Sequence, residues 1–267
     1  MNAVTVGQYF PGDSLLHRLD PRTKILAVLA LSVAIFLPKA WPGYVLMAAL
    51  VFTGVLLAQV PIRFILRGLR PILIFLAITV VFNAFLTPGE ALVTLGKWHI
   101  TREGLILSVV AATRLILLVI VASLLTLTTS PIRLTDGFER LLRPFSPLGV
   151  PAHELALMMT IALRFIPTLA DEADRIMRAQ AARGADFQSG NAVARIKGLI
   201  PVMVPLFVAA FRRADELATA MEARGYRGGH GRTKMRELVF TGKDFVALVL
   251  FAVILAAVIY LRVTGLG

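Results

Sequence analysis

Two arginines, each inside the same short phrase, are the residues of this chain best suited to specific recognition chemistry. Ala182-Arg183-Gly184 and Ala223-Arg224-Gly225 stand 41 positions apart, and each phrase follows an apolar run and then a charged segment. Arginine in the last turn of a helix complements the negative end of the helix dipole. Glycine directly after it can adopt the left-handed conformation that closes a helix. Each phrase therefore predicts a helix end that presents an arginine.

A helix cap explains one such phrase, but it does not require arginine at the matching position of a second. Two arginines at the ends of two similar helices suit a partner with two related subunits, because guanidinium groups bind carboxylates through bidentate contacts. The cap and the binding role are compatible, and the residues alone leave both open. The acidic residues behind the first arginine are expected to pair along their own helix, Asp171 with Arg175 and Asp174 with Arg178.

The sequence shows no arrangement of residues typical of catalysis. Its four histidines all fall in predicted loops or at segment boundaries: His17, His99, His153 and His230. His17 is expected to be a surface residue and not a metal ligand. There is no HExxH motif, and the glycine-rich stretch 225–231 lacks the GxxxxGK[ST] order of a phosphate-binding loop. We expect no enzymatic activity, no bound cofactor and no metal site in this chain.

The composition is that of an integral membrane protein. Of its 267 residues 57% are hydrophobic and only 16% are charged, with a mean hydropathy of +0.79, whereas a soluble domain is about 45–50% apolar and about 25% charged. Without cysteine there is no disulfide framework. The net charge of +12 could suggest nucleic acid. However, the basic residues flank or connect apolar runs, where they set membrane orientation. The lipid bilayer, and not nucleic acid, is the expected partner.

The apolar runs predict an all-α polytopic membrane protein with about five transmembrane helices and long cytoplasmic or interfacial coupling helices. A span needs about 20 residues, or about 17 at the short end. The expected spans are residues 25–37, 44–60, 72–86, 104–127 and 245–261. Asp20-Pro21 is expected to cap the first helix, with Arg22 and Lys24 at the cytoplasmic headgroups. Trp41 and Tyr44 are expected as interfacial anchors, and residues 87–102 as an outer loop.

Three parts follow from this assignment: a transmembrane part with four spans (1–127), a coupling-helix region (128–242) and a C-terminal transmembrane helix (243–267). Residues 131–143 predict a short amphipathic helix on the membrane surface. The two helices with the repeated phrase are placed at the inner boundary, because their apolar stretches are short or contain prolines, such as Pro201 and Pro205. Segments 1–24, 61–70 and 128–243 hold 23 of the 28 lysines and arginines. The N-terminus and the coupling region are therefore expected to be cytoplasmic.

These residues resemble a known family. The N-terminal phrase His17-Arg18-Leu19-Asp20-Pro21-Arg22-Thr23-Lys24, the predicted hairpin of spans and the two Ala-Arg-Gly phrases are similar to the transmembrane T component of energy-coupling factor (ECF) transporters, over essentially the whole chain. The resemblance implies a non-catalytic subunit in a prokaryotic cell membrane. It would join two ABC-type ATPases, which bind the ATP, to a membrane S component that captures a vitamin or metal ion.

The resemblance also assigns roles to residues. Arg183 and Arg224 would each enter a groove on one ATPase subunit, and the neighbouring small residues, Ala182, Gly184, Ala223 and Gly225, would leave room for close approach. Two other classes stay open: a conventional ABC importer permease with its own substrate path, and a membrane scaffold unrelated to transport. The scarcity of polar residues in the spans, mainly Arg114 and Asn83, counts against the permease. Copurified ATPases would exclude the unrelated scaffold, and an S component would separate the two transporters.

Overall fold

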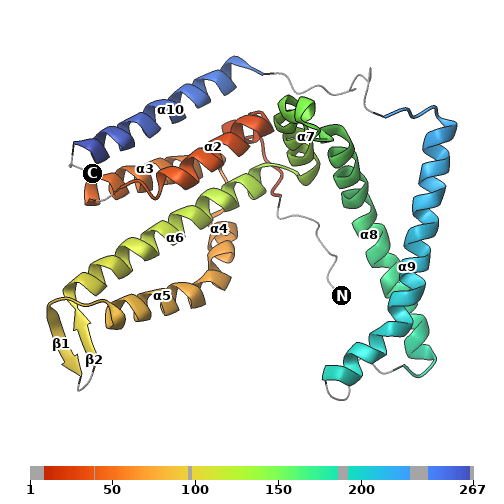
Figure 1. Ribbon diagram of the computed structural model, residues 1–267, viewed down its shortest axis with the longest axis horizontal. Coiled ribbons are helices and arrows are strands. Elements are labelled where there is room, and N and C mark those ends of the chain that lie inside the picture. Colours follow the sequence, from red (N-terminus) through yellow and green to blue (C-terminus); the bar gives the residue numbers. More distant parts are fainter. Residues whose placement is uncertain (1–8, 39, 96–97, 186–191, 229–239, 265–267) are drawn as a thin grey trace. The chain divides into compact units, whose positions relative to one another are not determined.

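The computed structural model describes residues 9–38, 40–95, 98–185, 192–228 and 240–264, and these are helical apart from one β-hairpin and short connections (Figure 1). The described chain divides into two compact units: residues 9–137 with 240–264, and residues 138–185 with 192–228. The predicted all-α polytopic membrane fold is confirmed. The two units are defined by how the chain packs, whereas the expected parts 1–127, 128–242 and 243–267 were defined by function. The expected division therefore stays a prediction.

The first unit contains most of the helices. They are α1 (Leu15–Arg18), α2 (Pro21–Ala34), α3 (Trp41–Ala58), α4 (Ile62–Leu69), η1 (Arg70–Ile72), α5 (Leu73–Leu86), α6 (Arg102–Thr128) and α10 (Gly242–Val263). The expected start of the first long helix is confirmed: the Asp20 side chain accepts the Arg22 N–H, and Pro21 occupies the first turn of α2. At the other end of the chain, Thr241 and Asp244 form a capping box at the start of α10.

Four helical segments in the described part of the chain are long and apolar enough to cross a membrane. They are α3, the continuous stretch Ile62–Leu86, α6, and α8 (Ala152–Ala182). The expected first span lies on α2, which has 14 residues, and the expected last span lies on α10, a helix of 22 residues with the apolar stretch Asp244–Tyr260. The chain is therefore a multi-pass membrane protein.

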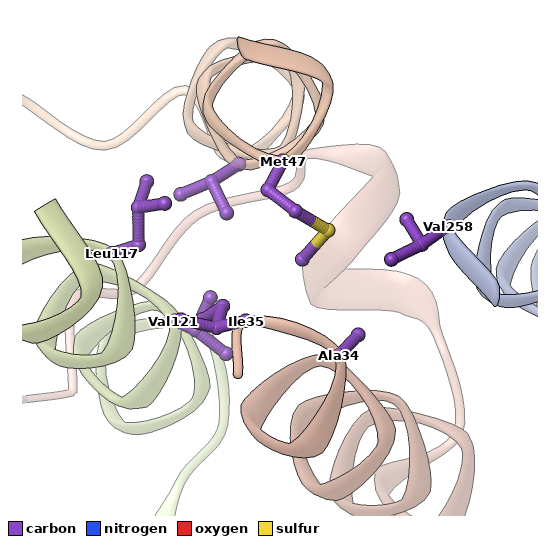
Figure 2. Close-up of a cluster of buried hydrophobic side chains, with 7 residues drawn as sticks. Ala34, Ile35, Met47, Leu117, Val121 and Val258 are labelled. Atoms are coloured by element: carbon purple, nitrogen blue, oxygen red, sulfur yellow. The ribbon is translucent and has the colours of Figure 1, made fainter. Parts of the chain in front are cut away.

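The core of the first unit lies where four helices meet. Met47 of α3 points into a cluster formed with Ala34 of α2, Ile35 directly after it, Leu117 and Val121 of α6, and Val258 of α10 (Figure 2). Met47 and Ile35 are completely buried. A second cluster, with Ala58, Val60, Ile65, Leu124 and Leu127, joins α3 and α4 to the end of α6. Lipid tails are as apolar as these side chains, so in a membrane such clusters hold α2, α3, α6 and α10 together by close van der Waals packing.

The N-terminal phrase is buried, which corrects two expectations. His17 is not a surface residue: it is 4% exposed, and its ring contacts Ser14 Oγ at 2.6 Å and the Phe10 carbonyl at 3.0 Å. Lys24 does not lie among headgroups, because its Nζ donates to the carbonyls of His17 and Thr128 and to Thr129 Oγ1. A buried charge needs such partners. The ammonium group thus serves as the cation at the C-terminal end of α6.

A buried carboxylate fastens the last helix to the first unit. Asp244 Oδ1 accepts the Asp20 N–H at 2.7 Å, and its Oδ2 accepts the N–H and the hydroxyl of Thr241 at 2.9 and 2.6 Å. Asp244 is 1% exposed. This one side chain therefore caps α10 and also satisfies the backbone donor of the residue that caps α2. The two helices, far apart in the sequence, begin at the same place.

The connection between α2 and α3 is also fixed by a polar contact. Tyr44 donates its hydroxyl hydrogen to the Pro38 carbonyl at 2.7 Å, and Arg114 Nη2 of α6 donates to the Tyr44 hydroxyl at 2.6 Å. Tyr44 is 4% exposed, so its expected place as an interfacial anchor is wrong. The burial is possible because the phenol has both a donor and an acceptor for its oxygen. Arg114, a charged residue within the apolar helix α6, thereby holds the turn at Pro38.

The expected outer loop contains a small antiparallel hairpin, β1 (Ala91–Leu95) and β2 (Trp98–Thr101). Residues 91–95 are mostly β-branched or apolar and suit a strand. Thr101 then caps α6, since its Oγ1 accepts the Gly104 N–H and donates to the Thr87 carbonyl. The hairpin thus leads directly into the longest helix of the first unit.

The second unit contains the two helices with the repeated phrase, α8 and α9 (Ala192–Ala223). Before them, α7 (Pro131–Leu142) confirms the short helix expected over 131–143, and η2 (Arg143–Leu148) leads to α8. Both long helices continue through their prolines, Pro167 in α8 and Pro201 and Pro205 in α9. The expectation that the apolar stretch of α8 is too short for a span is therefore wrong.

Candidate functional site: two matching helix ends

Both Ala-Arg-Gly phrases form the same helix ending. Gly184 has φ +86° and Gly225 has φ +72°, in the left-handed region that favours glycine. After α8, the Ala185 N–H donates to the Gln180 carbonyl and the Gly184 N–H to the Ala181 carbonyl, each at 3.0 Å. After α9 the corresponding bonds run from Tyr226 to Met221 and from Gly225 to Glu222. These are two complete Schellman motifs, as the residue pattern predicted.

The arginines stand at matching positions of these endings. Arg183 and Arg224 are each the residue between the last helical turn and the left-handed glycine, and both side chains are exposed. The flanking residues of each phrase, Ala182, Gly184, Ala223 and Gly225, are exposed too. The backbone is held by the cap, so each guanidinium is presented from a fixed position next to small residues. Such a group can bind a carboxylate through two parallel N–H···O bonds.

The two helices cross, and they run in opposite directions where they meet (Figure 1). Gln180, near the end of α8, donates its side-chain amide to the Pro201 carbonyl of α9 at 3.4 Å. Two turns earlier, Glu172 shares a crevice with α9 residues 204–216. Arg224 is 23 residues beyond Pro201, which is roughly 35 Å at about 1.5 Å per residue. The two arginines therefore lie at opposite ends of the crossed pair.

One contact at the crossing follows from the two prolines of α9, and the sequence analysis missed it. A helical carbonyl normally accepts the N–H four residues later. Proline has no N–H, so Pro205 leaves the Pro201 carbonyl without its helical donor. Gln180 supplies that donor from the other helix. The spacing of Pro201 and Pro205 was visible in the sequence and indicates a free carbonyl, but the sequence did not show which side chain would reach it.

Charged side chains line the crossing. A crevice of about 690 Å³ is lined by Glu172 of α8 and by Arg212, Arg213 and Glu216 of α9, together with apolar residues of α9. The pairs expected along α8 are wrong: within the described residues, ion pairs form between Arg22 and Asp20 and between His153 and Glu139, but not between Asp171 and Arg175 or between Asp174 and Arg178. Such surface pairs stabilise a helix by only a few tenths of a kcal/mol. Solvation of the separate charges can therefore outweigh the attraction within a pair.

The fold and the site define a multi-pass membrane protein with two capped helices that present matching arginines. Comparison with known proteins agrees. Residues 12–235 match the cobalt transport protein family, CbiQ. The energy-coupling factor transporter transmembrane protein EcfT of Clostridium kluyveri is 55% identical over 247 residues, 91% of each chain. Its counterparts in Acidaminococcus fermentans (52%, 97% of each chain) and Bacillus subtilis (46%, 98% of this chain and 99% of the relative) are also similar.

The chain belongs to this family of energy-coupling factor transporter transmembrane proteins. The resemblance inferred from the N-terminal phrase and the paired Ala-Arg-Gly phrases is confirmed. The chain is thus a transmembrane component of an ECF transporter, and its general role is transport across a membrane.

Proposed function

We propose that this chain is the coupling subunit of its transporter, and that Arg183 and Arg224 each bind one of two ABC-type ATPase subunits. The observation that carries the proposal is the identity of the two helix endings, which present the same exposed residue in the same backbone geometry. A cap needs the glycine, but it does not need arginine twice. Two equivalent contacts suit two related subunits, and carboxylates are the natural partners of both guanidinium groups.

The crossing of α8 and α9 supports a mechanical role. The helices meet near Gln180 and Pro201, one turn before Arg183, while Arg224 lies roughly 35 Å farther along α9 at about 1.5 Å per residue. When two ATPase subunits approach each other on binding ATP, they would move Arg224 relative to Arg183 and change the angle at the crossing. ATP would be bound by the partners, and the chain itself would carry no cofactor and no metal ion.

The same helices offer a surface for a membrane partner. Apolar side chains of α9 are exposed on several turns, among them Ile200, Met203, Phe207 and Phe211. We assign this surface to a substrate-binding S component, which would be reoriented when the crossing angle changes and would release a vitamin or metal ion inside the cell. From the positive charge of the coupling region and the N-terminus we infer that both lie in the cytoplasm.

The test is removal of the two guanidinium groups. An arginine that anchors an interface costs about 2 kcal/mol or more of binding when truncated, or roughly 30-fold in affinity at about 1.4 kcal/mol per tenfold. Arg183→Ala and Arg224→Ala should each weaken copurification of the ATPases only in part, because the remaining arginine still tethers the pair. The double variant removes both contacts and should lose copurification. Lysine at either position should restore little, since it lacks the bidentate fork.

Arg175→Ala is the matched control, because Arg175 is exposed on α8 two turns before the cap. It should leave ATPase copurification and substrate uptake unchanged. If the double alanine variant keeps both at the level of the control, the two arginines are helix caps only and the proposal fails. ATPases that copurify without any S component would instead favour a conventional importer permease.

A further inference from the structure

A cavity lies inside the helix bundle of the first unit. Its volume is about 180 Å³, and its walls come from α1, α2, α3, α6 and α10. Along α2 the lining runs from Thr23 to Leu31, next to the buried cluster that begins at Ala34 (Figure 2). Folded interiors hold few voids larger than a water molecule. An apolar cavity of about 150 Å³ is already large enough to bind benzene or xenon.

The walls of the cavity are apolar apart from Thr53 on α3 and one end, where Thr23, Lys24 and Thr128 lie. Three of these side chains have partners within the protein: Lys24 Nζ donates to three oxygens, Thr128 Oγ1 donates to the Leu124 carbonyl at 2.7 Å, and Thr53 Oγ1 donates to the Ala49 carbonyl at 2.8 Å. A water molecule in a cavity needs two to four polar partners. The long part of the cavity offers only the hydroxyl of Thr53, so its suitable occupant is apolar.

The cavity is open at the surface of the bundle. Leu57 on α3 and Leu250 on α10 line it and are nevertheless 42% and 54% exposed. The opening therefore lies on the side of these two helices, whose other exposed side chains, such as Phe52 and Val253, are apolar. In a multi-pass membrane protein such a face contacts lipid tails. From Lys24 to Leu31 the lining extends roughly 10 Å at about 1.5 Å per residue, which suits a segment of hydrocarbon chain and not a headgroup.

We propose that this cavity binds one acyl chain of a membrane phospholipid, which enters on the side of α3 and α10 and lies within the bundle beside α2. The chain supplies the contacts that the cavity walls otherwise lack. It thereby links the middle of α10 to the rest of the unit, whereas Asp244 fastens the first turn of α10. The bound lipid is then part of the native fold.

The test uses the full chain in vesicles of phosphatidylethanolamine and phosphatidylglycerol that contain a trace of phosphatidylcholine with a diazirine near the end of one acyl chain. After irradiation, mass spectrometry of peptides locates the adducts. Adducts are expected on cavity residues that bulk lipid cannot reach, namely Ala27, Val121 and Leu124, all less than 9% exposed. They should saturate as the probe fraction rises, while adducts on exposed Phe52 should rise in proportion.

A blocking variant distinguishes the cavity from general access to the bundle. A Cβ at Gly54 would meet Leu124 at 3.5 Å, an ordinary contact, and the rest of a leucine side chain would occupy the cavity. Gly54→Leu should reduce the interior adducts to background, and Ala247→Leu on α10 should do the same if the first variant does not fold. Ala49→Leu, at an exposed position of α3, should leave them unchanged. Adducts confined to outward-facing residues, or interior adducts that do not saturate or that persist in the blocked variants, overturn the proposal.

Discussion

Replacement of Asp244 by alanine should loosen α10 from the first unit by a measurable amount. The change strands the Asp20 N–H, which donates to Asp244 Oδ1 at 2.7 Å in a buried setting. An unsatisfied buried donor costs about 1–3 kcal/mol. The change also removes half of the capping box at Thr241, and loss of a helix cap costs about 1 kcal/mol. Together these effects predict a loss of roughly 2–4 kcal/mol in the free energy of unfolding.

The assay is thermal unfolding of the purified chain in detergent. For a chain of this size each kcal/mol lowers Tm by about 2–4 °C, so Asp244→Ala should lower Tm by roughly 5–15 °C. Asp244→Asn keeps an acceptor oxygen for the Asp20 N–H and should lose about half as much. Asp171→Ala, at an exposed position of α8, should change stability by about 0.5 kcal/mol at most. If Asp244→Ala unfolds at the same temperature as Asp171→Ala, the buried carboxylate does not fasten α10.

Two further changes test the turn at Pro38 and the orientation in the membrane. Tyr44→Phe removes the hydroxyl that joins Pro38 and Arg114, and it should destabilise the chain by about 1–3 kcal/mol in the same thermal assay. Tyr260→Phe, at a position 67% exposed, should have no effect, and equal shifts in both variants would refute a role for the Tyr44 contact. Because the chain has no cysteine, Leu148→Cys and Val263→Cys each introduce a single thiol at an exposed position. An impermeant thiol reagent on intact cells should label only the cysteine at position 263, and labelling at 148 instead would reverse the topology.

Much of the candidate site was predictable because its determinants are local. A left-handed residue after a helix is most easily glycine, so Gly184 and Gly225 indicated both helix ends without any knowledge of the fold. Asp20-Pro21 indicated the start of α2 in the same way. The separation of the arginines was not predictable, because it depends on how α8 and α9 pack, for example on which side chain reaches the Pro201 carbonyl, 21 positions after Gln180.

By itself the sequence determined the class of protein, most of its apolar segments and the ends of several helices. These properties depend on hydropathy summed over a span and on backbone preferences of neighbouring residues. Only the tertiary structure decided which charged residues near the membrane are buried and which groups they contact. Lys24 looked like a headgroup contact, yet it is buried because residues 104 and 105 positions later supply its acceptors. Asp244 caps its own helix and also accepts the backbone N–H of Asp20, 224 positions earlier. No local pattern indicates such partners, because a buried charge is stabilised by groups that only the folded chain brings within reach.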